Sequence, residues 1–207
     1  EAVKKGAAPH LTSKARTPYM TDTSEQHFKS QDFSHKQLSK KTFFECTFES
    51  CNFTECSWEN SKFCSCTFSH CNISLVKLEA CRLQDVLFTD CKMVGVDFFK
   101  CNSTFFSINC LKSFLQYSNF SDLKMKRVSF EKCTLKECHF SNTLLVEGCF
   151  KEAELPGTIF HNCDLSKADF SSASQYTIDP ETNKIKKAKF SLPEAVGLLR
   201  SFDILIT

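Results

Sequence analysis

Residues 41–70 read KTFFECTFESCNFTECSWENSKFCSCTFSH, and a large aromatic residue occupies every fifth position of this stretch. These aromatic residues are Phe43, Phe48, Phe53, Trp58, Phe63 and Phe68. The same spacing of large apolar residues runs from Phe28 to Phe98 and, after a shift of phase, from Leu115 to Phe170. Helices repeat at about 3.6 residues and strands at about 2, so neither explains the pattern. A short fixed period is typical of a repeat protein in which each unit buries its apolar residue against its neighbours.

The residue two positions before the large residue is nearly always small from Cys46 onward, as at Cys46, Cys51 and Ser61. We therefore expect each group of five to direct one bulky and one small side chain inward and the other three outward. A chain that turns a corner at every group closes a square coil after four groups, and stacked coils lie roughly 4.8 Å apart. The pattern predicts an all-β solenoid, a right-handed quadrilateral β-helix. We expect about seven coils in a rod on the order of 30–35 Å long, followed by a C-terminal helix and a short strand.

The repeat divides the chain into three parts. Residues 1–19 contain no repeat and are predicted to be an appended or disordered tail, residues 20–173 form the β-helix, and residues 174–207 form a C-terminal module. Phe98 and Leu115 are 17 positions apart, where 15 would keep the repeat in step. Two extra residues should therefore bulge out near residues 102–112. The candidate loop residues are Asn102, Ser103, Thr104, Phe105, Phe106 and Lys112.

Composition limits the possible partners. The chain has 26 basic and 24 acidic residues, and omitting residues 1–19 leaves 22 and 23, a net charge of −1. A nearly neutral protein does not have the charge typical of a nucleic-acid binder, so we expect no direct nucleic-acid partner. No run of 18 apolar residues is present, which predicts no membrane span. Residues 1–19 contain no apolar signal segment, so a cytoplasmic location is expected.

Fourteen cysteines raise the question of disulfides or metal. Eleven occupy the small inward position, where cysteine acts as a compact buried apolar residue. The exceptions are Cys64, which should point outward, Cys110 and Cys149. We favour buried free thiols over disulfides and over metal ligands. The six histidines are scattered, and no nucleophile elbow or glycine-rich phosphate loop is present. We therefore predict no catalytic residues, no metal, no cofactor and no enzymatic activity.

The C-terminal residues have a different pattern. Ser191 and Glu194 have capping-box spacing, and the apolar residues from Ala195 to Phe202 have the spacing of an amphipathic helix. Residues 204–206 are expected to form a short apolar strand. The module could cap the open end of the rod or join two copies, and the amount of apolar surface favours a homodimer. The candidate dimerisation residues are Leu198, Leu199, Phe202, Ile204 and Ile206.

Three segments carry a resemblance to a known family. CNFTE (51–55), CDLSK (163–167) and ADFSS (168–172) match a small residue, Asp or Asn, Leu or Phe, and two variable residues. This is the repeat of the pentapeptide-repeat proteins, which the chain resembles from about residue 28 to residue 173. The resemblance implies the square β-helix expected from the spacing.

A closer resemblance concerns function. The tail 178–206 and the stretches 71–75 and 91–98 are similar to albicidin-resistance pentapeptide-repeat proteins, and residues 33–48 and 118–135 are similar to quinolone-resistance ones. Those relatives are dimeric rods that resemble duplex DNA, bind DNA gyrase and rescue it from poisons. The resemblance implies a non-enzymatic, cytoplasmic protein that binds DNA gyrase or another type II topoisomerase and protects it from an antibiotic or toxin.

DNA mimicry requires an acidic surface. The candidate partner-facing acids are Glu45, Glu59, Glu79, Asp85, Asp90, Asp97 and Asp122. Lysine and arginine residues share the expected walls with these acids, so no wall is purely acidic. The alternative function is a generic protein-interaction scaffold with an unknown partner. Its contact patch would comprise the outward apolar residues Phe44, Leu75, Val94 and Phe99.

Overall fold

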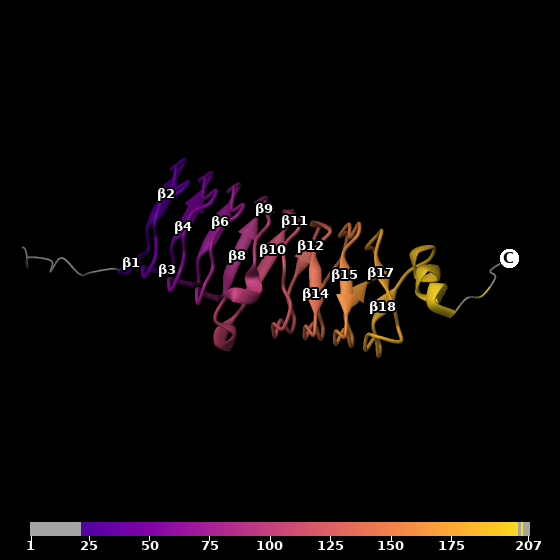
Figure 1. Cartoon of the computed structure of the whole chain (residues 1–207). Coiled ribbons are helices and arrows are strands. Elements are labelled where there is room, and N and C mark those ends of the chain that lie inside the picture. Colours follow the sequence, from indigo (N-terminus) through magenta and orange to yellow (C-terminus); the bar gives the residue numbers. More distant parts are fainter. Residues whose placement is uncertain (1–21, 203, 205–207) are drawn as a thin grey trace, which may run out of the picture.

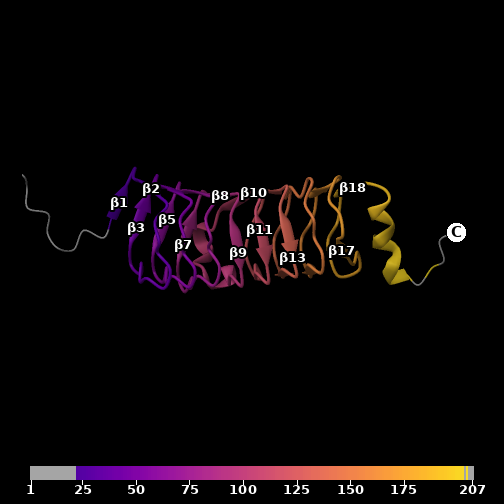
Figure 2. The ribbon, with the colours of Figure 1, turned by 90° about the horizontal axis from the view of Figure 1, so that it is seen from above.

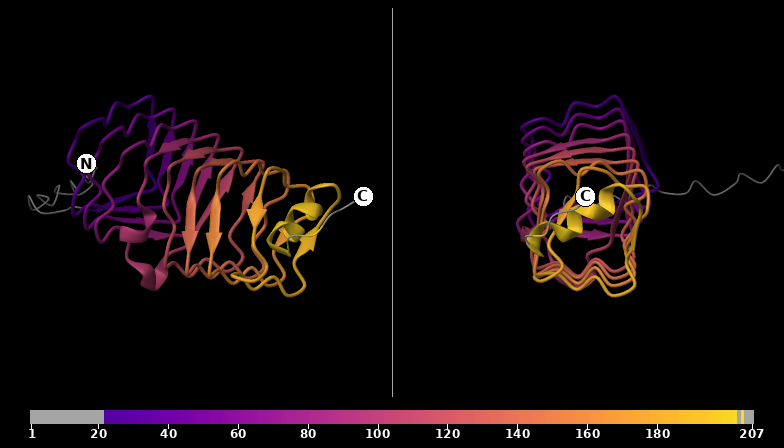
Figure 3. Two further views of the ribbon diagram at one scale, coloured as in Figure 1. Left: turned by 45° about the vertical axis from the view of Figure 1, so that its right-hand side comes forward. Right: turned by 90° about the vertical axis from the view of Figure 1, so that its right-hand side faces the viewer.

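The computed structural model describes residues 22–202 and 204. They form a right-handed quadrilateral β-helix of about eight turns (Figures 1 and 2). Viewed along its axis the rod has four sides, with a helix across its C-terminal end (Figure 3). The predicted fold class is confirmed, with one turn more than the spacing indicates. Residues 1–19, predicted to be a tail, lie outside the described residues.

Short parallel strands form the sides, and each pairs with the strand one coil away. One sheet contains β1 (Asp22–Ser24), β3 (Thr42–Phe44), β5 (Lys62–Cys64) and β7 (Arg82–Gln84). The longest sheet contains β2 (His27–Lys29), β4 (Thr47–Glu49), β6 (Thr67–Ser69), β8 (Val86–Thr89), β10 (Ile108–Leu111) and β12 (Phe130–Glu131). A third sheet contains β9 (Lys92–Val94), β11 (Phe114–Gln116) and β13 (Thr134–Lys136). A fourth contains β14 (His139–Ser141), β15 (Ile159–His161) and β17 (Thr177–Ile178). The last pairs β16 (Asp169–Phe170) with β18 (Lys189–Phe190). Three 3₁₀ helices are η1 (Phe98–Lys100), η2 (Ser103–Phe105) and η3 (Glu194–Phe202).

We number the four walls by the interior residues that stack in each. Wall 1 contains Phe43, Phe63, Leu83, Met125, Leu145 and Leu165. Wall 2 contains Phe48, Phe68, Phe88, Cys110, Phe130, Phe150 and Phe170. Wall 3 contains Phe53, Ile73, Met93, Leu115, Leu135 and Leu155. Wall 4 contains Trp58, Leu78, Phe98, Phe120, Phe140 and Phe160.

The interior consists of stacked side chains. The Phe140 ring is 0% exposed and lies parallel to those of Phe120 and Phe160, at centroid distances of 4.9 and 5.1 Å. The small residues between the rings are equally buried, with Cys66 at 1% and Ser61 at 0%. Each group of five therefore turns one large and one small side chain inward, as predicted.

Polar outward residues hold the corners of the coil. The Thr54 amide and hydroxyl both donate to Asn52 Oδ1, at 3.1 and 2.7 Å. Asn72 Nδ2 then donates to Thr54 Oγ1 from the next coil at 2.9 Å. Ser34 makes the same two bonds to Asp32, and these bonds lower the pKa of that carboxyl group. Asn and Asp recur before the large residue because their side chains can close this local turn.

The predicted phase shift is present. Phe68 pairs with Phe88, 20 residues on, whereas Phe88 pairs with Cys110, 22 residues on. The two extra residues are accommodated by η1 and η2, between walls 4 and 1. Lys112, predicted to be part of this loop, lies outside it at the corner between walls 2 and 3, where its N–H donates to the Glu131 carbonyl.

The coil continues beyond Phe170. Phe160 pairs with Ile178 and Phe170 pairs with Phe190, so β17 and β18 add a further coil. The first of these separations is 18 residues and the second is 20. The coil is therefore shortened before Ile178 and lengthened after it. This irregular spacing hides the last coil from the five-residue pattern.

The C-terminal helix differs from the amphipathic α-helix that the spacing predicts. In a 3₁₀ helix, residues three apart share a face. Ala195 and Leu198 are therefore half-buried, while Val196, Leu199 and Phe202 are exposed. The Ser191 hydroxyl donates to the Ser171 carbonyl of the preceding coil, so it does not form the predicted capping box.

The short strand expected at residues 204–206 can be assessed at one position only. Ile204 lies in no strand, and the other two residues, Ile206 among them, lie outside the described part of the chain. None of the helices in the described part has both the length and the apolar character that crossing a bilayer requires.

All 14 cysteines lie in the described part of the chain, and all are free thiols. Cys64 and Cys149 are half-exposed, and the other 12 are buried. Cys110 replaces a phenylalanine in the wall 2 ladder and is 1% exposed. Burial raises the pKa of Cys66 to about 11 and the pKa of Cys133 and Cys138 to about 12. The prediction of buried free thiols is confirmed for these residues.

Replacing Phe140 with Ala should lower the free energy of unfolding by about 3–5 kcal/mol, because the change leaves a cavity between two stacked rings. Phe99→Ala is the control, since Phe99 is 42% exposed on the same wall; its effect should stay within about 0.5 kcal/mol. Urea unfolding monitored by circular dichroism would measure both. Equal effects of the two substitutions would contradict the stacked core.

Thiol alkylation of the native protein at neutral pH should modify Cys64 and Cys149 alone. The other thiols are buried, so the reagent cannot reach them in the folded protein. Mass spectrometry of peptides after brief iodoacetamide treatment would identify the modified sites. Treatment of the unfolded protein, in which every thiol should react, is the control. Modification of Cys66 or Cys138 in the folded protein would contradict this assignment.

Stability should fall as the pH rises from about 9 to about 11. The unfolded thiols lose their protons near pH 9, whereas burial in the fold raises the pKa of Cys66 to about 11. The unfolded state therefore releases protons first, and rising pH favours it. Cys66→Ala and Cys138→Ala together should flatten this part of the stability curve relative to the parent. An unchanged slope would show that these thiols do not contribute.

Candidate protein-binding surface

Four of the seven predicted acids lie together on one side of the rod. Glu59 and Glu79 stack in neighbouring coils of wall 4, Asp97 lies one coil further on, and Asp122 lies at the corner between walls 4 and 1. We call these four residues the acidic strip. Asp122 accepts a hydrogen bond from Asn142 Nδ2 at 3.1 Å, so amide groups continue the column.

A lysine partly neutralises the acidic strip. Lys100 Nζ lies 3.1 Å from both a Glu79 and an Asp97 carboxylate oxygen. Hydrogen bonds and charge attraction from Asp97 and then Glu79 raise the pKa of Lys100. Such exposed pairs contribute little to stability. Their main effect is to lower the net negative charge of this wall.

The other three predicted acids are separated from the strip. Glu45 and Asp85 occupy the corner between walls 1 and 2, where Asp85 accepts a hydrogen bond from the Ser107 hydroxyl. Asp90 lies at the corner between walls 2 and 3. The apolar residues proposed for a scaffold patch are also divided, with Phe44 on wall 1 and Phe99 on wall 4.

The two-residue insertion leans towards the N-terminal end of the rod. The Phe105 ring lies 4.1 Å from the guanidinium carbon of Arg82, in strand β7. Asn102 caps η2 by accepting a hydrogen bond from the Thr104 amide. Ser103, Thr104 and Phe105 are exposed, whereas Phe106 is 6% exposed and points into the core.

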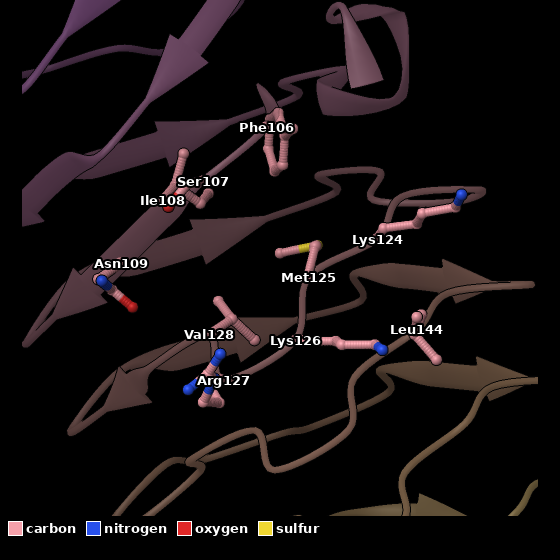
Figure 4. A pocket seen from close by; sticks show the side chains of 10 residues that line it. All are labelled: Phe106, Ser107, Ile108, Asn109, Lys124, Met125, Lys126, Arg127, Val128 and Leu144. Atoms are coloured by element: carbon pink, nitrogen blue, oxygen red, sulfur yellow. The ribbon is translucent and has the colours of Figure 1, made fainter. Parts of the chain in front are cut away.

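A notch of about 430 Å³ lies on the other side of the insertion. Figure 4 shows Phe106 and Ile108 along one side of it and residues 124–128 along the other. Met125 and Val128 contribute apolar surface, while Lys124, Lys126 and Arg127 are exposed cations. The sequence analysis did not single out these residues. The segment LKMKR (123–127) was the available signal, because it alternates inward apolar and outward basic residues.

The C-terminal end presents an apolar face. Leu198 packs against the core, and η3 contacts β17. Val196, Leu199, Phe202 and Ile204 are 39–53% exposed. Of the predicted dimerisation residues, Leu199, Phe202 and Ile204 are therefore exposed, and Leu198 is half-buried against the core.

No group of three or more His, Cys, Asp or Glu side chains converges as a possible metal site within residues 22–202. Two histidines of the first coil contact glutamates of the next coil. His27 Nε2 lies 3.0 Å from a Glu49 carboxylate oxygen, and His35 Nδ1 lies 3.4 Å from a Glu55 carboxylate oxygen. These are surface pairs between neighbouring coils.

Comparison with known proteins found two family models that match parts of the chain. A family model described as a pentapeptide repeat region matches residues 41–112, and one described as the SV2A/B/C luminal domain matches residues 108–178. No curated protein matches.

Among solved structures, one similar chain is HetL, a pentapeptide-repeat protein involved in heterocyst differentiation regulation from the cyanobacterium Nostoc sp.. It is 15% identical, the match covers 84% of this chain and 87% of HetL, and the TM-score is 0.54. Another is a trypsin-treated form of QnrB1, a plasmid-mediated fluoroquinolone resistance protein. It is 19% identical, the match covers 93% of each chain, and the TM-score is 0.47.

The family repeat matches residues 41–112, and the same pair of inward residues continues through Phe170. The HetL comparison supports the same fold. Residues 41–112 therefore match the pentapeptide repeat region, and the chain has the fold of a known pentapeptide-repeat protein.

Proposed function

We propose that this chain is a non-enzymatic rod that acts by binding another protein along its walls. The observation that carries this proposal is the regular array of outward side chains. Backbone hydrogen bonds between coils hold each column, as between Asn60 N–H and the Glu79 carbonyl at 2.9 Å. A wall of this kind is preorganised, so a partner loses little free energy in ordering it.

The partner that we propose is DNA gyrase or a related type II topoisomerase, which the protein would protect from an antibiotic or toxin. Two features support this choice. The tail 178–206 and the stretches 71–75 and 91–98 resemble gyrase-protecting pentapeptide-repeat proteins. In addition, the acidic strip gives one wall a row of carboxylates that a DNA-binding surface could accept.

Charge alone gives this protein only a partial likeness to DNA. Duplex DNA carries one negative charge per about 1.7 Å of its axis. The strip has at most one acid per coil on wall 4, and Lys100 pairs with two of its members. Binding to gyrase would therefore also need contacts without charge. Phe99, exposed beside Lys100, is the nearest large apolar side chain on that wall.

We propose that two copies join through the C-terminal end. Val196, Leu199 and Phe202 follow one line on the exposed side of η3, and Ile204 extends this face. A twofold contact would bury these residues and roughly double the length of the rod. The cytoplasmic location expected from the sequence agrees with gyrase as the partner.

The first test is gyrase supercoiling with a fluoroquinolone or albicidin, at rising concentrations of this protein. We expect the parent protein to restore supercoiling. Replacement of Glu59, Glu79 and Asp97 with Lys should raise the concentration needed by about tenfold or more, because it reverses the field that steers association. The matched control replaces Glu131, Glu152 and Glu154 with Lys, because it makes the same charge change away from the strip.

Loss of protection in the control variant as large as in the strip variant would contradict the assignment of this wall. Absence of both gyrase binding and protection for the parent protein would exclude gyrase as the partner. The scaffold with an unknown partner would then be the remaining function.

A further inference from the structure

The two-residue insertion interrupts the stacking on one wall only. Phe98 and Phe120 stack on wall 4 with a centroid distance of 4.6 Å, and Met93 pairs with Leu115 on wall 3. The ladders of walls 2, 3 and 4 are therefore continuous across the insertion. On wall 1, residues 102–105 bulge outward where the next rung of the ladder would lie, and Phe106 turns back into the core.

The bulge is bonded to the coil before it. Asn102 N–H donates to the Cys81 carbonyl at 2.8 Å, and Ser107 N–H donates to the Leu83 carbonyl at 2.9 Å. Together with the Phe105 ring over Arg82, these bonds hold the insertion against β7. The space left by the missing rung therefore opens on the side of the following coil, at Lys124.

The edge of that following coil is unpaired. Elsewhere on wall 1 the corresponding amide reaches back to the previous coil, as Arg82 N–H does to Ser61 and Leu144 N–H does to Leu123, at 2.8 and 3.0 Å. Among the described residues, no backbone carbonyl accepts from Lys124 N–H across the gap. Lys124 therefore lies at an open strand edge, of the kind to which a further strand can be added.

The side chains around this edge favour one kind of occupant. Lys124, Lys126 and Arg127 project at the notch, and no carboxylate of the described residues lies within ion-pair distance of them. The acids at the two neighbouring corners have other partners: Asp122 accepts a hydrogen bond from Asn142 Nδ2 at 3.1 Å, and the Glu147 carboxylate is paired with Lys167 at 2.9 Å. Between the cations, Met125 and Val128 supply an apolar floor together with Phe106 and Ile108.

We propose that this notch binds an extended acidic segment of a partner protein by strand addition. The segment's backbone would pair with the edge at Lys124. Side chains alternate along a strand, so acidic residues at alternate positions would meet Lys124, Lys126 and Arg127 while an apolar residue between them contacts Met125. A nucleic acid supplies the charge but neither the strand backbone nor the apolar side chain. The site lies on wall 1, beyond the Asp122 end of the acidic strip, and does not depend on gyrase being the partner.

The test uses the full chain and a fluorescein-labelled peptide, Gly-Glu-Val-Glu-Val-Glu-Gly, in anisotropy titrations. We expect saturable binding, and no binding of the analogue in which Lys replaces each Glu. Lys124→Glu, Lys126→Glu and Arg127→Glu together should weaken binding by about tenfold or more. The matched control is Lys184→Glu, Lys186→Glu and Lys187→Glu, which makes the same charge change further along wall 1 and should bind nearly as the parent does.

Two further measurements separate strand addition from simple charge attraction. N-methylation of the peptide's Val residues should weaken binding by about tenfold, because it removes backbone donors. Hydrogen exchange at the Lys124 amide should slow when the peptide binds. Any one of three results would overturn the proposal. The methylated peptide could bind with equal affinity, or both triple variants could lose affinity equally. The third result is displacement of the peptide by a DNA duplex with no change in Lys124 exchange. Thermal unfolding of both variants would check that their exposed substitutions leave the fold intact.

Discussion

Hydrogen bonds between successive coils stabilise a backbone that would be unfavourable in a single coil. Most groups of five end in a non-glycine residue with positive φ, such as Glu45 at 52° and Leu75 at 58°. This left-handed conformation costs roughly 1–2 kcal/mol per residue. The same residues donate to the next coil, as Glu45 N–H does to the Cys64 carbonyl at 2.9 Å, and each such bond contributes about 0.5–1.5 kcal/mol net. The two terms nearly cancel, so the rod depends on the stacked interior for its stability, and no coil is stable without neighbours.

This dependence explains where the fold tolerates irregularity. The insertion after Phe98 leaves the ladders of three walls continuous and concentrates the disruption on wall 1. Breaking every ladder would separate the rod into two shorter solenoids with exposed ends. The bulge instead interrupts the interior stack on wall 1 only. The unpaired edge at Lys124 is therefore a direct result of preserving the interior stacks.

The five-residue spacing was sufficient to predict the square coil, because a large residue such as Phe63 or Phe140 can be buried at that period in few other ways. It could not predict the last coil, where Phe160 pairs with Ile178 after a shortened separation. The exposed face of η3 was mispredicted because the spacing was interpreted with α-helical geometry. The notch also could not be predicted from the sequence. Its position depends on the direction in which the insertion leans, and the contact of Phe105 with Arg82 that decides this joins residues from different coils.

The distribution of charge has a consequence for how partners could approach. The acidic strip runs along wall 4 from Glu59 to Asp97 and ends with Asp122 at the corner with wall 1, whereas Lys124, Lys126 and Arg127 are exposed cations of wall 1 at the notch. Opposite charges therefore occupy adjacent walls. A basic surface would be steered to the first region and an acidic segment to the second. Because a rigid solenoid keeps the two regions at a fixed separation, a single partner that carries both kinds of surface could engage them only in one orientation.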